Sequence, residues 1–296
     1  MKQMCRFLCY TGSPVMLADL LYRPGHSLIL QSYKARERRE PLNGDGFGVG
    51  WYQPEISLTP CVFTSLTPAW SNRNLQRLAE HVKSPCFFAH VRAASPGMQV
   101  AEANCHPFQF GRYLWMHNGT VEGFNQIKRR VQQSLPDHLY HAIQGTTDSE
   151  HAFAVFLNLL GDTERIAPTR EIGQLLVRTV ERLEQWTLET EIAGPSYYNF
   201  AVTDGQSLAA IRYVSDQRLE PASLYYATSR KFLRPDSDDR PGETDADECA
   251  VIIASERLTE QKDDWVRVAP NHVLTVAANL EVAVELVSVQ RRENES

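Results

Sequence analysis

Long apolar segments are absent from the sequence. No apolar run approaches the roughly 18 residues that a membrane-spanning helix needs, so we expect no membrane association. The first residues also lack the apolar core of a secretory signal peptide. The expected compartment is therefore the cytoplasm.

Excess positive charge and paired cysteine motifs are missing as well. The net charge of −6 does not fit the basic surface of a nucleic-acid-binding protein, so no nucleic acid is expected as a partner. No C-x-x-C spacing occurs, which favours reduced thiols over a disulfide framework. The cysteines are Cys5, Cys9, Cys61, Cys86, Cys105 and Cys249.

The composition is that of a soluble globular protein, with 43% hydrophobic and 22% charged residues. We expect a single domain over residues 1–290, followed by a frayed tail at 291–296. The segment 234–249 is rich in acidic residues and contains proline, and it is predicted to be a solvated, mobile loop.

Local patterns predict a chain that alternates between strands and helices. Ser13-Pro14 has the form of a helix N-cap followed by proline at the first helical position. Asp204-Gly205 between two apolar runs predicts a hairpin. Thr147 and Glu150 have capping-box spacing at the start of an apolar helix.

Cys5 opens an apolar run at the start of a predicted strand. If Met4 is the true initiator and is removed, Cys5 holds a thiol and an α-amine on one residue. Their unperturbed pKa values, about 8.5 and about 7.7–8.0, suit a nucleophile and its base near neutral pH. A buried structural cysteine is the alternative interpretation.

Three other positions allow both a structural and a functional interpretation. Arg92 ends a strongly apolar strand, where it is either a rim residue or an anion-binding residue. Asp148 in the first turn of a helix either complements the helix dipole or binds an ammonium group. Asn118-Gly119 is a turn signal, but the helical spacing of the residues that follow favours a strand-to-helix junction that can present donors to an oxyanion.

Two further classes of site fit the sequence poorly. A zinc site would draw on His90, Cys105, His106 and His117, but these lack close ligand spacing. A papain-type Cys-His pair has no local signature here. We therefore expect neither a metal nor a cofactor.

Six motifs resemble, in order, those of the class II glutamine amidotransferases, which are N-terminal-nucleophile hydrolases. The resemblance spans nearly the whole chain and is strongest to the stand-alone branch. That branch includes the catalytic subunit of the fungal glutathione-degrading complex and the ergothioneine-pathway γ-glutamyl hydrolase. The motifs begin at Met4, Asn43, Phe88, Cys105, Met116 and Thr147.

The resemblance implies an α+β fold, a four-layer α/β/β/α sandwich with two antiparallel sheets between helical layers. It implies Cys5 as nucleophile, with its own α-amine as base. Asn118 and the backbone of Gly119 would form the oxyanion hole. For a γ-glutamyl head it implies that Arg92, assisted by Ser95, binds the α-carboxylate and that Asp148 binds the α-ammonium.

The implied activity is hydrolysis of the C–N bond of a small γ-glutamyl amide, such as glutathione or an ergothioneine precursor. A glutaminase subunit that supplies ammonia to a separate protein partner is the second interpretation. A binding or scaffold protein with a blocked N-terminus is the third. Residues 1–4 precede the nucleophile, so the first two interpretations require a later start or removal of a short leader.

Overall fold

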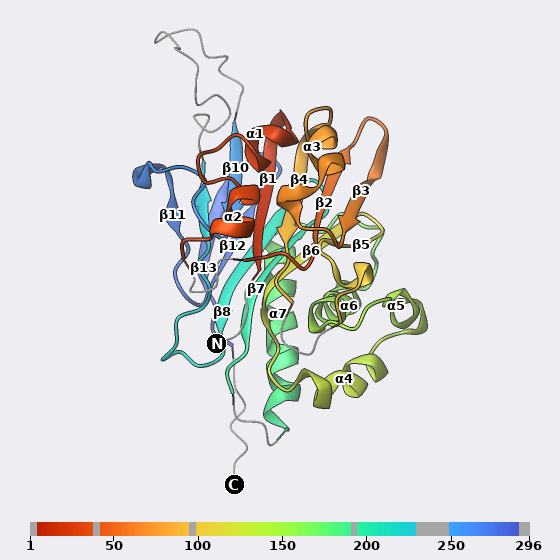
Figure 1. The fold of residues 1–296 in the computed structure, drawn as a ribbon. Helices are drawn as coiled ribbons and strands as arrows, with labels where there is room; N and C mark the ends of the chain where they lie inside the picture. Colours follow the sequence, from red (N-terminus) through yellow and green to blue (C-terminus); the bar gives the residue numbers. More distant parts are fainter. Residues whose placement is uncertain (1–4, 38–41, 95–98, 191–193, 229–248, 290–296) are drawn as a thin grey trace.

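The computed structural model describes residues 5–37, 42–94, 99–190, 194–228 and 249–289. Within these ranges the strands form two antiparallel sheets (Figure 1). The first sheet has the order β11-β9-β10-β1-β4-β2-β3 and the second β13-β12-β8-β7-β6-β5. The strand bounds in the first sheet are β1 Arg6–Met16, β2 Phe47–Gln53, β3 Ser57–Ser65, β4 Lys83–Val91, β9 Tyr225–Ala227, β10 Ala250–Ala254 and β11 Val266–Arg267. Those in the second are β5 Phe108–Phe110, β6 Tyr113–Thr120, β7 Tyr197–Thr203, β8 Leu208–Val214, β12 His272–Val276 and β13 Val282–Leu286.

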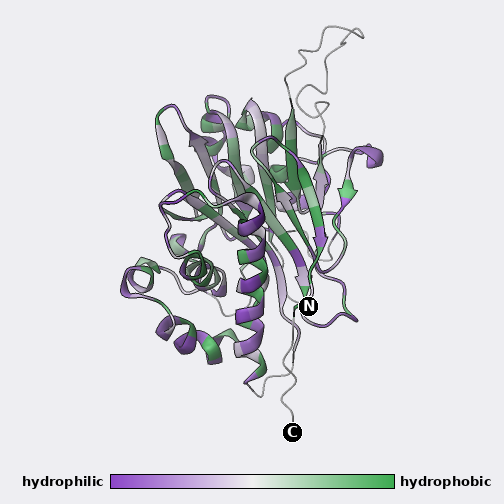
Figure 2. Cartoon of the chain, turned by 180° about the vertical axis from the view of Figure 1, so that it is seen from behind, coloured by the Kyte–Doolittle hydropathy of each residue, from purple (hydrophilic) through white to green (hydrophobic). Residues whose placement is uncertain are grey.

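Helices cover the outer face of each sheet. Short helices pack over the first sheet: α1 Leu17–Leu21, α2 Leu28–Lys34 and α3 Arg73–Ala79. Those over the second sheet are α4 Phe124–Gln133, α5 Asp137–Ala142, α6 Asp148–Leu160 and α7 Thr169–Leu188. The outward side of α7 is largely hydrophilic in Figure 2, as expected for a helix that buries one face. Among the described residues, no helix combines the length and apolar character needed to span a bilayer.

The alternation of side chains along the strands creates three separate cores. On β1, Phe7 and Cys9 point into a core between the sheets, whereas Leu8 packs under the helices of the first sheet. On β6, Met116 points into the same interior core and Trp115 packs under the helices of the second sheet. Three cores require four layers, so the predicted α/β/β/α sandwich is confirmed.

The pairing of β1 with β4 positions the start of the chain. Arg6 lies opposite Val91 and Phe7 opposite His90. Extending this register by one residue places Cys5 opposite Arg92, at the end of both strands. Because Cys5 and Arg92 have the same parity as Phe7 and His90, both side chains are directed to the interior side of the sheet.

The expectation of a helix start at Ser13-Pro14 is wrong. Both residues lie in β1, which continues to Met16, and the helix begins at Leu17. Val15 and Met16 still pair with β4 after an irregularity in the register that follows Thr11. Cross-strand pairing therefore outweighs the local capping signal.

The helix start at Thr147 is confirmed, because its side chain accepts the backbone N–H of Glu150. The capping box is not reciprocal, however. The Glu150 carboxylate instead accepts the N–H groups of Gln144 and Gly145 and so holds the preceding loop. The predicted hairpin at Asp204-Gly205 is confirmed, since β7 and β8 pair on either side of it.

Several expectations concern residues outside the described ranges. They are the leader 1–4, the acidic loop over residues 234–248 and the tail 291–296. Ser95 also lies outside them.

Candidate active site

The thiol of Cys5 lies half-buried at the end of the first sheet. Its Sγ accepts the N–H of Ala93 at 3.4 Å and lies 3.7 Å from the Ala93 carbonyl oxygen. These contacts keep the sulfur beside the residue that follows Arg92. All six cysteines fall within the described ranges and none forms a disulfide, as the sequence predicts.

The guanidinium of Arg92 is buried, with 3% of the residue exposed. It donates to the carbonyl oxygens of Asp45 at 3.4 Å and Gln99 at 3.3 Å. The nearby carboxylate of Asp45 instead accepts the N–H of Ala94. Among the described residues Arg92 forms no ion pair, so a buried cation with five donors keeps the capacity to bind an anion.

Asn118 is fully buried, yet both polar atoms of its side chain lack a hydrogen-bond partner among the described residues. It shares the interior side of β6 with Leu114 and Met116. Buried amides are normally hydrogen-bonded, so the Asn118 side chain keeps the capacity to bond a group outside the chain.

A contact between the two sheets shows that Asn118 lies at the same end as Cys5 and Arg92. His90 Nε2 lies 3.2 Å from the carbonyl oxygen of His117, the residue before Asn118. His90 itself is two residues from Arg92 on the interior side of β4. The polar residues of both sheets therefore gather at one end of the interior layer.

Gly119 follows Asn118 at the end of β6, and the structure permits no side chain there. A Cβ would lie 2.0 Å from the carbonyl oxygen of Tyr197 and 2.5 Å from His117 Nε2. The backbone of β7 thus approaches β6 closely at this point, as a glycine in a strand allows.

Asp148 is the first residue of α6 and lies beside the end of β6. Its Oδ2 accepts the N–H of Val121 at 2.8 Å, and its Oδ1 lies 3.2 Å from the Ser149 hydroxyl. Ser149 also contacts His117 Nδ1 at 2.9 Å. Burial lowers the pKa of His117, while the Asp148 carboxylate acts in the opposite direction. Asp148 has no cationic partner within the described residues, so it can receive one from a ligand.

Three histidines gather behind these groups, an arrangement that the sequence analysis missed. His90 and His106 stack with ring centroids 4.2 Å apart, and His117 adjoins them. Burial lowers the pKa of His90 to about 3 and the pKa of His106 well below its usual value, so both rings are neutral near pH 7. Each histidine lies one or two residues after the start of one of the six motifs, those at Phe88, Cys105 and Met116, and this position is the signal that could have identified it.

These histidines do not form a metal centre. Within the described ranges, no group of three or more His, Cys, Asp and Glu side chains is arranged to hold a metal ion. The neutral rings of His90 and His106 instead fill the space behind the candidate site.

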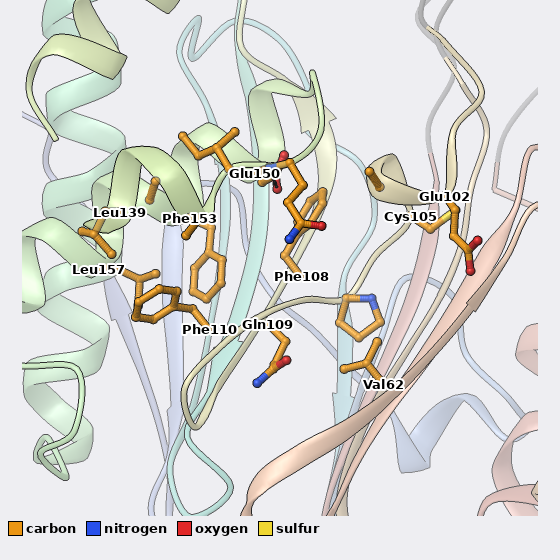
Figure 3. A pocket seen from close by; sticks show the side chains of 16 residues that line it. Val62, Glu102, Cys105, Phe108, Gln109, Phe110, Leu139, Glu150, Phe153 and Leu157 are labelled. Carbon is orange, nitrogen blue, oxygen red and sulfur yellow. Dashed lines mark hydrogen bonds between the residues drawn. The ribbon is translucent and has the colours of Figure 1, made fainter. Parts of the chain in front are cut away.

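A cavity of about 250 Å³ lies beside the segment 102–109, between β3, β5 and the helices α5 and α6. Figure 3 shows Phe153, Phe110 and Leu157 on its apolar side, with Cys105 and Glu102 opposite. Of the candidate site residues that the structure describes, none lines this cavity. Cys105, which lines the cavity, lies close enough to Arg92 and Cys5 for their charges to affect the pKa of its thiol, so the cavity adjoins the cluster around Cys5.

Comparison with protein families identifies a match over residues 16–296 to the model of class-II glutamine amidotransferases. The matched range includes Arg92, Asn118, Gly119 and Asp148, and it begins after Cys5. Probable glutamine amidotransferase DUG3 of Saccharomyces cerevisiae is 40% identical over 297 residues, covering 92% of this chain and 82% of that protein. Gamma-glutamyl-hercynylcysteine sulfoxide hydrolase of Mycobacterium tuberculosis is 34% identical over 161 residues, which cover 54% of this chain and 65% of that protein.

Solved structures share the overall fold of this chain. A glutamine aminotransferase class-II domain protein from Silicibacter pomeroyi matches with a TM-score of 0.69 and 26% identity, covering 97% of this chain and all of that one (100%). Glutamine phosphoribosylpyrophosphate amidotransferase from B. subtilis matches with a TM-score of 0.58 and 14% identity, over 97% of this chain and 50% of that one; this likeness concerns the fold alone. Family model, sequence relatives and fold agree, and the chain belongs to the class-II glutamine amidotransferases.

Proposed function

We propose that this protein is an enzyme that hydrolyses the C–N bond of small γ-glutamyl amides. The observation that supports this most directly is the buried amide of Asn118, which has no partner within the described part of the chain and lies at the same end of the interior layer as Cys5 and Arg92. An amide donor without a partner is what an oxyanion hole requires before substrate binds.

Recognition of the γ-glutamyl head uses two opposite charges. Arg92 binds the α-carboxylate through its remaining donors, and Asp148 binds the α-ammonium. Ser95, the other residue expected to assist Arg92, is part of the same proposal. With both ends of the head bound, the side-chain amide of the substrate is presented to Cys5.

The chemistry requires Cys5 to be the first residue of the active chain. Its α-amine takes the thiol proton, and the thiolate attacks the γ-carbonyl carbon. The side chain of Asn118 and the N–H of Gly119 stabilise the oxyanion, and the protonated amine returns its proton to the leaving nitrogen. Water then attacks the γ-glutamyl thioester, with the amine again as base. The products are glutamate and a free amine.

A γ-glutamyl thiol compound, such as glutathione or an ergothioneine precursor, is the proposed substrate class. The mycobacterial relative is named as a hydrolase of gamma-glutamyl-hercynylcysteine sulfoxide, which is a sulfur-containing γ-glutamyl compound but not a thiol. A glutaminase that delivers ammonia to a separate synthase would use the same residues. The two possibilities differ in the leaving group and in the response to a partner.

The test uses protein expressed from the full sequence without an N-terminal tag, with its intact mass determined. Glutamate release is measured with glutamine, glutathione and a bulkier γ-glutamyl amide. We expect a thiol-bearing leaving group to give a higher kcat/KM than glutamine, because remote binding energy can act in the transition state. Cys5→Ala should abolish release while the protein stays folded.

Three results would contradict this proposal. Full activity in protein that retains Met1 would exclude the α-amine of Cys5 as the base. Fastest release from glutamine, increased by a synthase, would favour the ammonia-supplying function. No glutamate release from any substrate by protein that begins at Cys5 would support a non-catalytic role.

A further inference from the structure

A buried cluster of an arginine, a glutamate and a histidine lies beneath the backbone of Cys5. The carboxylate of Glu256 contacts Arg6 Nε and His26 Nε2, each at 2.7 Å. All three residues are almost completely buried, with 1–3% of each side chain exposed. Burial alone would raise the pKa of Glu256, but the bonds from His26 and Arg6 outweigh it and lower the pKa to about 2. The carboxylate is therefore charged at neutral pH.

Backbone groups complete the cluster. Glu256 also accepts the N–H of Arg36 at 2.9 Å and the N–H of Glu37 at 3.2 Å. The preceding residue, Ser255, bonds both backbone groups of Phe7, through its side chain and its own N–H. The segment after β10 thus holds the first residues of β1 from the side opposite to β4.

Arg6 connects this cluster to the nucleophile. While its Nε bonds Glu256, its Nη1 donates to the carbonyl oxygen of Cys5 at 2.9 Å. Arg6 has the same parity on β1 as Leu8, which packs under the helices, whereas Cys5 has the parity of Phe7 and faces the interior layer. The guanidinium therefore lies on the opposite face of the sheet from the site and reaches Cys5 only through its backbone.

We propose that Arg6, Glu256 and His26 are positioning residues that hold the backbone of Cys5 in the orientation needed for attack. This inference rests on the proposed function of Cys5. A residue at the end of a strand frays readily, and more so when it begins the chain. A planar guanidinium bound at two of its nitrogens fixes a direction that a single ammonium cannot.

The chemistry of the cluster favours positioning over stability. A buried ion pair contributes little net stability, because desolvation of both charges offsets their attraction. Its geometry, however, is well defined. A displacement of the thiol and amine by about 1 Å would lower the rate on the order of 100-fold without touching the groups that bind the substrate head.

Arg6→Lys tests the proposal, with Arg212→Lys as a matched control. Arg212 is likewise buried, and it bonds the carbonyl oxygens of Ala222 and Val268 and the carboxylate of Glu220. The readouts are kcat and KM for the best γ-glutamyl substrate, Tm, and the pH profile of Cys5 alkylation by iodoacetamide, followed by mass spectrometry. Glu256→Gln and His26→Gln provide two further variants.

We expect Arg6→Lys to lower kcat on the order of 100-fold, with KM within about 2-fold of the parent value, and to shift the alkylation profile. Arg212→Lys should lower Tm but leave kcat and the alkylation profile unchanged. Glu256→Gln and His26→Gln should lower kcat in the same direction, to a smaller extent.

Alkylation needs no substrate, so it separates this inference from the proposed function. An altered alkylation profile in a protein that hydrolyses no γ-glutamyl amide would support the positioning role of Arg6 and reject the proposed function. If folded Arg6→Lys hydrolyses the substrate with an unchanged kcat and an unchanged alkylation profile, the positioning role of Arg6 is rejected. Equal losses of kcat in Arg6→Lys and Arg212→Lys would show a merely structural effect and would also reject it. If Arg6→Lys fails to fold, an unchanged kcat and alkylation profile in Glu256→Gln would overturn the proposal.

Discussion

The interior layer between the two sheets contains two contrasting regions. Its apolar centre comprises Phe7, Cys9, Phe88, Leu114 and Met116, which pack against one another across the sheets. Its polar end comprises Cys5, His90, Arg92 and Asn118, which continue the same strands on the same side. One set of strands therefore builds a core at one place and a candidate active site at the other.

Cysteines show most clearly how the two regions differ. Burial raises the pKa of Cys86 to about 12 and that of Cys9 well above its usual value. Both thiols in the centre are therefore inert near neutral pH. Cys5 is only half-buried and contacts backbone groups of Ala93. Position along the layer, and not residue type, decides which thiol can act as a nucleophile.

The polar end also leaves buried groups without partners, at the expense of stability. Among the residues that the structure describes, neither polar side-chain atom of Asn118 has a hydrogen-bond partner, and neither does either ring nitrogen of His106. Unpartnered buried groups each cost about 1–3 kcal/mol. If this region binds the substrate, as proposed, its residues should affect the rate, whereas residues of the centre should affect stability.

Among variants that keep Cys5, the largest effect on rate should come from Arg92→Gln. A neutral amide would leave the buried α-carboxylate of the substrate unpaired, which costs about 3–5 kcal/mol, or two to four decades in kcat/KM. A γ-glutamyl substrate with an amidated α-carboxylate provides the control. Wild type and variant should turn it over at similar low rates; a variant that is equally impaired on both substrates would show that Arg92 does not bind this group.

Asn118→Ala should lower kcat by about 10²–10³-fold, because one oxyanion donor is lost. Its unfolding free energy should stay the same or increase, since the amide has no partner to lose. Asn199, opposite it on β7, is the matched control because its side chain donates to the carbonyl oxygen of Ala222. Asn199→Ala should reduce stability more than rate. The reverse pattern would exclude Asn118 from the oxyanion hole.

Leu114→Ala should act in the opposite way. This fully buried side chain belongs to the apolar centre, and its truncation is expected to reduce the unfolding free energy by about 2–5 kcal/mol. Below the unfolding transition, kcat/KM should change by no more than a few-fold. Denaturant titration and steady-state kinetics at the same temperature provide the comparison. A loss of rate as large as that of Asn118→Ala would mean that the two regions are not separable.

At neutral pH the smallest effect should come from His90, which concerns stability in acid. His90 has a pKa of about 3 in the fold, lowered by burial, against about 6.5 when unfolded. Because the unfolded chain binds the extra proton, stability falls as the pH drops from about 6.5 toward 3, at up to roughly 1.4 kcal/mol per pH unit for this residue. His90→Gln should reduce that slope between pH 6 and pH 4 by about one proton. His81→Gln, at an exposed histidine, should not.

Elements with strong local signals could be predicted from the sequence. The hairpin at Asp204-Gly205 and the helix start at Thr147 both depend on nearby residues, and both are confirmed. Ser13-Pro14 had an equally clear signal, yet it lies in β1 because Val15 and Met16 pair with β4. A partner nearly 70 residues away along the chain leaves no trace in a local pattern.

Motif order was sufficient to predict the family and the fold, and the strand pattern places Cys5 and Asn118 at strand ends. The tertiary structure alone decided that these ends meet, through the contact of His90 with the backbone of His117. It also brought Glu256 to the side chain of Arg6, 250 positions away in the chain, and Arg6 in turn bonds the carbonyl oxygen of Cys5. Local preference depends on neighbours in the chain, whereas buried charges and unpartnered amides depend on which distant strands exclude water around them.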